Sequence, residues 1–214
     1  MEEILSRLGG HREASRRKKI EAILNAGKKI FFEKGFMNAT MREIARESQL
    51  STGTIYFYFK GKDEIYGMIV EEAFNIMLNF IGEEIKTVED PLEKLSAITR
   101  AYIRFYTDNP EYFDILGYND FGFRRVGLPD KVLERLDNLS IDAFKVLNSI
   151  MVTAIEKGLI SDKRESWDLT FAFWASISGI IFIHKRGYLD RFNIDIENIV
   201  EIELDILLRG VSPE

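Results

Sequence analysis

The spacing of apolar residues is the feature that most restricts the fold of this chain. Apolar side chains return at steps of three and four residues, whereas strict apolar–polar alternation never lasts long enough to predict a strand. The first segment of this kind has its apolar or small residues at Ile20, Ile23, Leu24, Gly27, Ile30 and Phe31. The sequence therefore predicts an all-α fold of about nine helices, without internal repeats or low-complexity linkers.

Capping residues and helix breakers place the ends of the first helices. Gly35 is expected to end the first helix, because glycine is common just past a helix. Thr40, with Glu43 three residues later, predicts a capping box at the start of a second, short helix. Ser51 is expected to cap a third short helix, and Gly61 separates it from a long fourth helix.

Proline and glycine mark the later helices. We expect helices over residues 91–108, from Pro110 into EYFDILGY, from about 130 to Gly158, from about 166, and over 195–209. Between them, the stretch from Gly117 to Pro129 holds three glycines and one proline and predicts a loop with little regular structure.

Composition excludes several classes of site. The 214 residues include no cysteine and only two histidines, His11 and His184, which excludes disulfide frameworks, thiolate zinc sites and histidine-rich metal centres. We therefore expect neither a metal nor a cofactor. The start MEEILSRLGGHRE has no apolar run of signal-peptide length, which predicts a cytoplasmic location.

One uncharged apolar run, residues 169–183, raises the question of a membrane span. Its 15 residues would make a helix of about 22 Å, whereas a span needs about 20 residues. The run is interpreted as a buried or interface helix, and no membrane partner is expected.

Charge divides the chain unevenly. Residues 1–62 carry 13 Lys and Arg against 7 Asp and Glu, a net charge of +6, whereas the whole chain has a net charge of −6. A basic head for a polyanion and an acidic body facing away from it would explain this asymmetry, and so would chance clustering on solvated helix faces. The predicted division places a head at 1–62 and a body at 63–214.

Residues 40–62, TMREIARESQLSTGTIYFYFKGK, carry the most informative motif. They predict two short helices joined by a tight turn at residues 48–50, the layout of a helix-turn-helix whose second helix enters the major groove. Small residues at 51–54 would let the backbone approach bases. Side chains suited to holding phosphates follow at Tyr56, Tyr58 and Lys62.

The segment from about Arg16 to Tyr66 resembles the DNA-binding domain of TetR-type regulators. Three blocks agree in content and spacing: ILNAGKKIFFEKGF, TMREIA and LSTGTIYFYFKGKDEI. The resemblance implies a nine-helix, homodimeric subunit that binds double-stranded operator DNA with three helices and uses the rest for ligand and dimer contacts. It implies phosphate contacts from Thr40, Tyr56, Tyr58 and Lys62, and places near bases Arg42, Thr52, Gly53, Thr54 and Phe57.

Two positions depart from the family pattern. Gln49 stands in the turn where the family usually has glycine, which costs about 1 kcal/mol if the backbone is left-handed. Gly27 stands where the family prefers alanine, which weakens the first helix by up to about 1 kcal/mol. Neither departure removes a group implied to contact DNA, so they bear on local geometry only.

Structural interpretations of the same residues are open. Tyr56 and Tyr58 could be packing aromatics, and Arg42 could face solvent, whereas Phe59 is expected in the core. The basic run at residues 16–19 is equally consistent with a solvated helix start and with a flexible arm near the DNA backbone.

The predicted body is dense in aromatic residues. These rings could simply pack the core; as a group beside a glycine-rich loop, they favour a cavity for a small hydrophobic effector. The predicted ligand-binding residues are Tyr102, Phe105, Tyr106, Phe113, Tyr118, Phe121, Phe123, Phe171, Trp174 and Ser178.

The apolar helix and the final helix are predicted to form the homodimer interface. Family resemblance implies four helices there, two from each subunit, and small residues would allow close approach. The predicted interface residues are Ala172, Ala175, Ser176, Gly179, Ile183, Ile199 and Leu207. Packing within one subunit is the alternative.

These features predict a repressor that releases operator DNA when it binds its effector. A non-sensing architectural DNA-binding protein is the first alternative, and a sensor whose head binds protein is another. An enzyme is not expected, because no histidine pair, cysteine or phosphate-loop motif is present. Repression and activation are not distinguished by the sequence.

Overall fold

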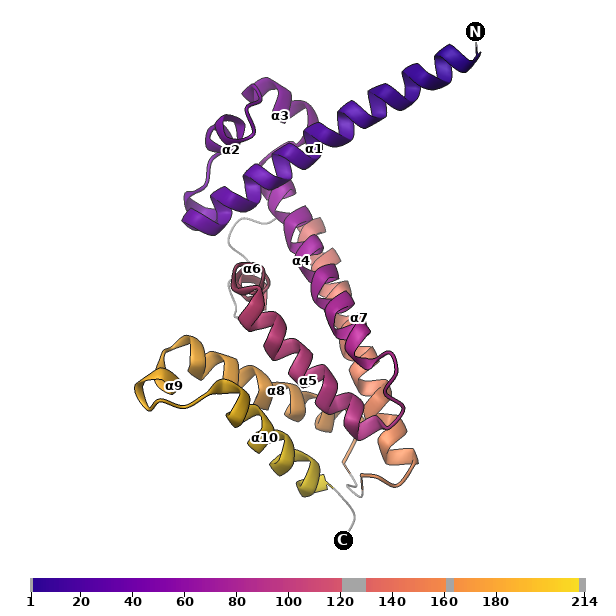
Figure 1. Cartoon of the computed structure of the whole chain (residues 1–214), viewed down its shortest axis with the longest axis vertical. Helices are drawn as coiled ribbons and strands as arrows, with labels where there is room; N and C mark the ends of the chain where they lie inside the picture. Colours follow the sequence, from indigo (N-terminus) through magenta and orange to yellow (C-terminus); the bar gives the residue numbers. More distant parts are fainter. Residues whose placement is uncertain (1, 121–129, 161–163, 212–214) are drawn as a thin grey trace. The chain divides into compact units, whose positions relative to one another are not determined.

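The computed structural model describes residues 2–120, 130–160 and 164–211, and within these every regular element is a helix (Figure 1). The elements are α1 (Glu2–Asn38), α2 (Met41–Glu47), α3 (Thr52–Tyr58), α4 (Lys62–Ile85), α5 (Pro91–Asp108), α6 (Pro110–Asp120), α7 (Asp130–Glu156), α8 (Ser166–Lys185), α9 (Tyr188–Arg191) and α10 (Ile196–Val211). The all-α prediction is confirmed. The helix beyond the expected nine is α9, whose four residues are too few to leave a periodic signal.

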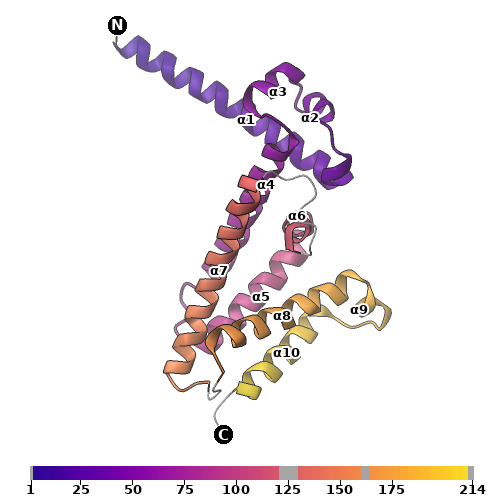
Figure 2. The ribbon, with the colours of Figure 1, turned by 180° about the vertical axis from the view of Figure 1, so that it is seen from behind.

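The chain forms two compact units. Unit 1 comprises residues 1–74 and 114–136, and unit 2 comprises 75–113 and 137–214. In unit 1, α2 and α3 lie on the same side of α1, and the N-terminal half of α1 extends beyond them (Figures 1 and 2). The fully buried side chains of Ile23, Ile44, Ile55 and Ile65 form the core that joins these helices.

One expected boundary is met and another differs in the structure. Gly35 adopts the non-helical φ 71° and ψ 163° and interrupts α1 there, although the element as a whole extends to Asn38. Residues 117–120, expected in a loop, belong to α6, so that part of the loop prediction is wrong. A helix started by a proline can continue through a glycine at a cost of about 1 kcal/mol. Residues 121–129 lie outside the described part of the chain.

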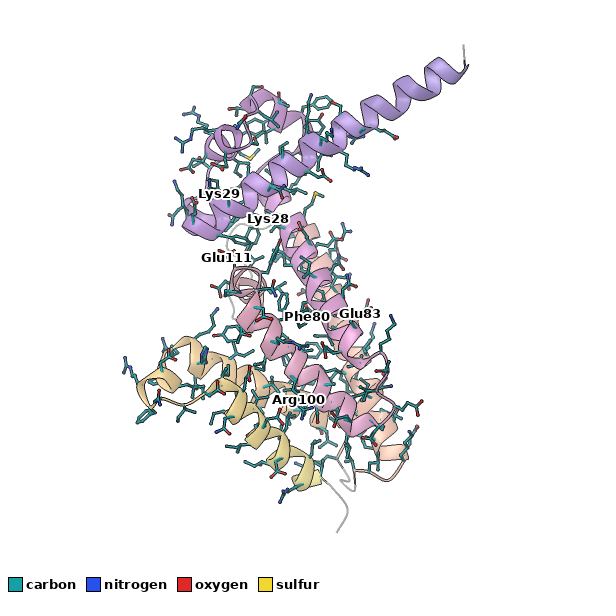
Figure 3. The ribbon with its side chains drawn as sticks, viewed as in Figure 1. Lys28, Lys29, Phe80, Glu83, Arg100 and Glu111 are labelled. Atoms are coloured by element: carbon teal, nitrogen blue, oxygen red, sulfur yellow. The ribbon has the colours of Figure 1, made fainter. Side chains whose placement is uncertain are left out.

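Unit 2 is built from α5, α8, α9 and α10 with the adjoining parts of α4, α6 and α7. α10 packs on both α5 and α8. Arg100 on α5 donates to both carboxylate oxygens of Glu201 on α10, at 2.7 and 3.0 Å, and also to Glu93 (Figure 3). The Arg100 hydrogen bonds lower the pKa of the Glu201 carboxyl. This planar, bidentate pair links α5 to α10 at their exposed surface.

Among the helices in the described ranges, only α8 is long and apolar enough to cross a membrane by length and composition. One side of it is buried in unit 2, including Phe173, Ile177 and Ile181, where α8 packs with α10 and α9. A core helix passes the same test of length and hydropathy.

Candidate nucleic-acid interface

The start of α2 is held by the predicted capping box. The Thr40 hydroxyl accepts from the backbone N–H of Glu43, and a Glu43 carboxylate oxygen accepts from the backbone N–H of Thr40 at 3.0 Å. Lys34 on α1 also donates to Glu43. The hydrogen bonds from Lys34 and Thr40 hold the pKa of the Glu43 carboxyl at about 2, against an ordinary value of 4.5. This network fastens the first turn of α2 to α1.

A left-handed residue joins α2 to α3. Gln49 has φ 57°, while the neighbouring N–H groups of Ser48 and Leu50 bond to carbonyls of Ile44 and Ala45. The chain therefore turns within residues 48–50, as predicted. An exposed glutamine occupies the conformation in which glycine carries no steric cost.

α3 is anchored from one side and exposed on the other. The Ser51 hydroxyl caps the helix by accepting from the Thr54 N–H at 3.1 Å, and Ile55 and Phe59 are buried in unit 1. Phe59 is thus in the core, as expected. Tyr56 and Phe57 are instead 54% and 80% exposed, which excludes a packing role for these two rings within unit 1.

The other predicted DNA contacts occupy the same two helices. Arg42 on α2 and Gly53 on α3 are exposed, and Thr52, Thr54 and Tyr58 are half-buried. Thr40 is exposed, but its hydroxyl is engaged in the capping box. Unit 1 therefore brings these predicted residues together around one helix-turn-helix.

Lys62 has partners within the chain. Its ammonium donates to the carbonyls of Phe36, Met37 and Ala39, at 2.8, 3.1 and 2.9 Å, and lies 4.6 Å from the centre of the Phe36 ring. Lysine satisfies the free carbonyls at a helix C-terminus in this way. Sequence reasoning missed this contact, which joins the start of α4 to the end of α1, and phosphate binding by Lys62 remains a prediction.

Several lysines of α1 are paired with carboxylates. Lys28 binds Glu72 on α4 at 2.9 Å, and Lys29 binds Glu47 on α2 at 2.7 Å (Figure 3). The Glu47 carboxylate raises the pKa of Lys29. By contrast, residues 16–19 place four consecutive basic side chains, all exposed, on α1.

In unit 2, part of the predicted ligand-binding set forms one aromatic cluster. Tyr102 packs against Phe113 and Trp174, with ring centroids 5.6 and 4.7 Å apart, and Tyr106 packs against Phe113 at 4.8 Å. The Tyr106 hydroxyl lies 2.6 Å from Nδ1 of His184. The cluster thus combines buried rings with one polar pair, and sequence reasoning did not assign His184 to it.

The remaining predicted ligand residues have different surroundings. Phe105 is fully buried against Phe80, and Ser178 is half-buried. Phe171 is half exposed and is linked to the cluster through Phe144, whose ring centroid lies 5.2 Å from that of Phe171 and 5.5 Å from that of Trp174. The side chains of Tyr118, Phe121 and Phe123 lie outside the described part of the structure. Within the described residues, no group of three His, Cys, Asp or Glu side chains is placed to hold a metal ion.

One face of α8 and α10 carries exposed apolar and small residues. Of the predicted interface residues, Ala172, Ala175, Gly179 and Ile183 are exposed, and Ser176, Ile199 and Leu207 are half-buried. Sequence reasoning did not include the neighbouring exposed side chains of Phe182, Ile202 and Ile206. The spacing of Ile199, Ile202 and Ile206 would have indicated them, because residues three and four apart share a helix face.

Comparison with known proteins identifies the family. Residues 23–68, from the middle of α1 into α4, match the model described as bacterial regulatory proteins, tetR family. This segment of the chain is a TetR-family domain.

Relatives of this chain include named regulators. HbdR of Aromatoleum sp. is 35% identical over 80 residues, which are 37% of this chain and 35% of that protein. KstR2 of Mycolicibacterium smegmatis, a transcriptional repressor, is 22% identical over 199 residues, or 93% and 92% of the two chains. The alignment with HbdR thus spans about a third of its length, and that with the activator FasR of M. smegmatis about half.

Solved structures share the fold of this chain. FadR from Bacillus subtilis in complex with stearoyl-CoA has a TM-score of 0.70 and 18% identity, covering 90% of this chain and 99% of that one. AibR in complex with isovaleryl coenzyme A and operator DNA has a TM-score of 0.70 and 16% identity, covering 89% and 98%. At these identities the likeness establishes the fold.

One departure from the TetR-family pattern has a structural cause. A Cβ on Gly27 would lie 2.7 Å from Cγ2 of Ile65 and 3.2 Å from Cδ1 of Ile69, and both isoleucines are fully buried. The absence of a side chain at position 27 therefore permits α1 and α4 to approach closely. Sequence reasoning judged this glycine only by helix propensity, because its neighbours are about 40 residues away in the chain.

Proposed function

We propose that this TetR-family protein is a homodimeric, cytoplasmic transcriptional regulator that binds operator DNA and releases it on binding a small hydrophobic effector. Residues 1–62 are the DNA-binding part, and residues 63–214 bind the effector and form the dimer. The supporting observation is α3, which is anchored through Ile55 and Phe59 and leaves Tyr56 and Phe57 exposed.

The DNA contacts follow from this arrangement. α3 enters the major groove, with Thr52, Gly53, Thr54 and Phe57 near base edges, while Thr40, Tyr56 and Tyr58 hold phosphates. Arg42 on α2 lies near the bases. For Lys62 we propose an added role: it holds α4 to the end of α1 and thereby positions α3, and any phosphate contact requires it to exchange a carbonyl partner.

Dimerisation uses the face of α8 and α10. A helix-turn-helix dimer must place its two recognition helices about 34–36 Å apart, one turn of DNA, to enter successive major grooves. The exposed small residues Ala172, Ala175 and Gly179 permit close approach of the partner's helices, and the exposed Phe182, Ile202 and Ile206 provide apolar area to bury.

The aromatic cluster of Tyr102, Tyr106, Phe113 and Trp174 is the proposed core of the effector site. Similar folds were solved with stearoyl-CoA and with isovaleryl coenzyme A, which supports acyl-coenzyme A compounds as the first ligands to test. The effector must bind one arrangement of the two recognition helices better than the other, because equal affinity for both would shift no equilibrium.

The test is DNA binding by the full-length protein at several salt concentrations. Tyr56→Ala should weaken binding to DNA from around its own gene by about tenfold or more, whereas Tyr188→Ala, a similarly exposed tyrosine of unit 2, should not. Wild-type affinity should fall steeply with salt.

Other outcomes of this experiment would favour a different function. Equal affinity for unrelated duplexes would favour the architectural alternative, and absence of binding at low salt would refute the DNA-binding function. Unchanged operator affinity at saturating acyl-coenzyme A would exclude that compound as the effector.

A further inference from the structure

The chemistry of α3 restricts what it can recognise. Its seven residues, TGTIYFY, include no Arg, Lys, Asn, Gln, Asp or Glu. Guanine is usually read by Arg or Lys, adenine by Asn or Gln, and cytosine by Asp or Glu. α3 therefore lacks the side chains that make the common bidentate contacts, although the proposed function places it in the major groove.

Phe57 is the most exposed large apolar side chain among the described residues, at 80%. It follows Ile55 by two residues, about 200° around the helix, so it lies opposite the anchored side of α3. Its ring meets the Tyr58 ring edge-on, with centroids 5.1 Å apart, which restricts the orientation of the phenyl group.

Among the described residues, no side chain covers the backbone of α3 beside the Phe57 ring. Gly53 precedes Phe57 by four residues and so shares its face of the helix. A Cβ on Gly53 would have only Ser51 Oγ, at 3.9 Å, within 4 Å. No side chain therefore separates this part of α3 from a groove floor, and the phenyl ring is the group that projects.

We infer that Phe57 reads the C5-methyl group of thymine, so that α3 selects its operator through thymine positions. This inference rests on the proposed DNA-binding function. The thymine methyl is the apolar group that the major groove presents, and apolar side chains recognise it by contact. Burying the phenyl ring against it removes apolar surface of both partners from water.

The experiment uses the full-length protein and a duplex selected by the wild type from a random pool. Each thymine of that duplex is replaced in turn by deoxyuridine, which removes only the methyl group. At one or two positions per half-site, wild-type affinity should fall by about fourfold, which is about 0.8 kcal/mol for one buried methyl-sized group at 1.4 kcal/mol per tenfold.

The Phe57→Ala variant, tested on the same thymine and deoxyuridine duplexes, completes a double-mutant cycle between protein and DNA. It should bind the thymine duplex at least about tenfold more weakly and should not distinguish deoxyuridine at those positions. Met37→Ala, an exposed apolar truncation also in unit 1, should retain the wild-type discrimination. Circular dichroism verifies that both variants are folded.

Three results would overturn the inference. Wild type could be indifferent to deoxyuridine at every position, or Phe57→Ala could retain the discrimination, or it could bind as tightly as wild type. Failure of the wild type to select any duplex is a different result, because it refutes the proposed DNA-binding function itself.

Discussion

At the scale of single residues, the contacts of Gly27 and Lys62 give these residues structural roles that their residue types alone do not predict. Gly27 weakens α1 by propensity but permits contact with Ile65 across the core. Lys62 is suited to phosphate by its charge and its place at a helix start, yet its ammonium donates to three carbonyls at the end of α1 and just after it. A DNA-binding test that truncates Lys62 would therefore disturb the fold as well as the interface, and Tyr56 is the cleaner probe.

The substitution Gly27→Ala tests the close approach of α1 and α4. Overpacking a buried site costs about 1–3 kcal/mol, whereas the gain in helix propensity is about 1 kcal/mol. We expect a net loss of free energy of unfolding, measured by urea denaturation. Gly82→Ala is the matched control: nothing lies within 4 Å of its added Cβ, so it should be neutral or stabilising by up to about 1 kcal/mol. Stabilisation by Gly27→Ala would refute the packing argument.

At the scale of elements, each short helix of the motif depends on a few fixed contacts. α2 and α3 have seven residues each, too few to be stable alone in water. Capping by Thr40 and Ser51 satisfies N–H groups in their first turns, and Ile44 and Ile55 bury their inner sides. The geometry offered to DNA is therefore set by caps and by one or two buried residues per helix.

The capping box gives α2 a defined dependence on pH. Because the pKa of Glu43 is about 2 in the folded protein and near 4.5 when unfolded, its contribution to stability is present above about pH 4.5 and is lost as pH falls toward 2. Glu43→Gln should lower the melting temperature at pH 6, and the difference from wild type should shrink between pH 4.5 and 2. In a Lys34→Gln background, the loss of melting temperature caused by Glu43→Gln should be smaller, because the hydrogen bond from Lys34 to Glu43 is already absent. A constant difference over that range would contradict the assignment.

At the scale of the whole molecule, the proposed function requires two subunits joined through α8 and α10. In that function, dimer formation sets the spacing of the two recognition helices, and effector binding releases DNA by changing that spacing. The apolar face of α8 and α10 and the aromatic cluster both lie in unit 2, where α5, α8 and α10 pack together. In the proposed function, this common location would couple effector binding to the dimer interface.

Gly179→Arg tests the dimer face. Nothing lies within 4 Å of a Cβ at position 179, so the monomer accommodates a side chain there, but a bulky charge would separate the two subunits. We expect the dissociation constant of the dimer, measured by analytical ultracentrifugation, to rise by at least about tenfold. Operator affinity at low protein concentration should fall with it. The control Gly82→Arg places the same side chain at another open helical glycine. A dimer of unchanged affinity in Gly179→Arg would place the interface elsewhere.

The sequence by itself determined the helical class, the boundaries of most helices, the capping of α2 and α3, and the helix-turn-helix with its family. These features depend on residues within about four positions of each other, so periodicity and capping patterns express them directly. Only the tertiary structure decided that Phe57 is exposed and that Ile65 packs against the bare backbone of Gly27. It alone also decided that Lys62 donates to carbonyls and that the Tyr106 hydroxyl pairs with His184. These depend on which distant surfaces pack together, and a pairing 26 or 78 residues apart leaves no local pattern in the chain.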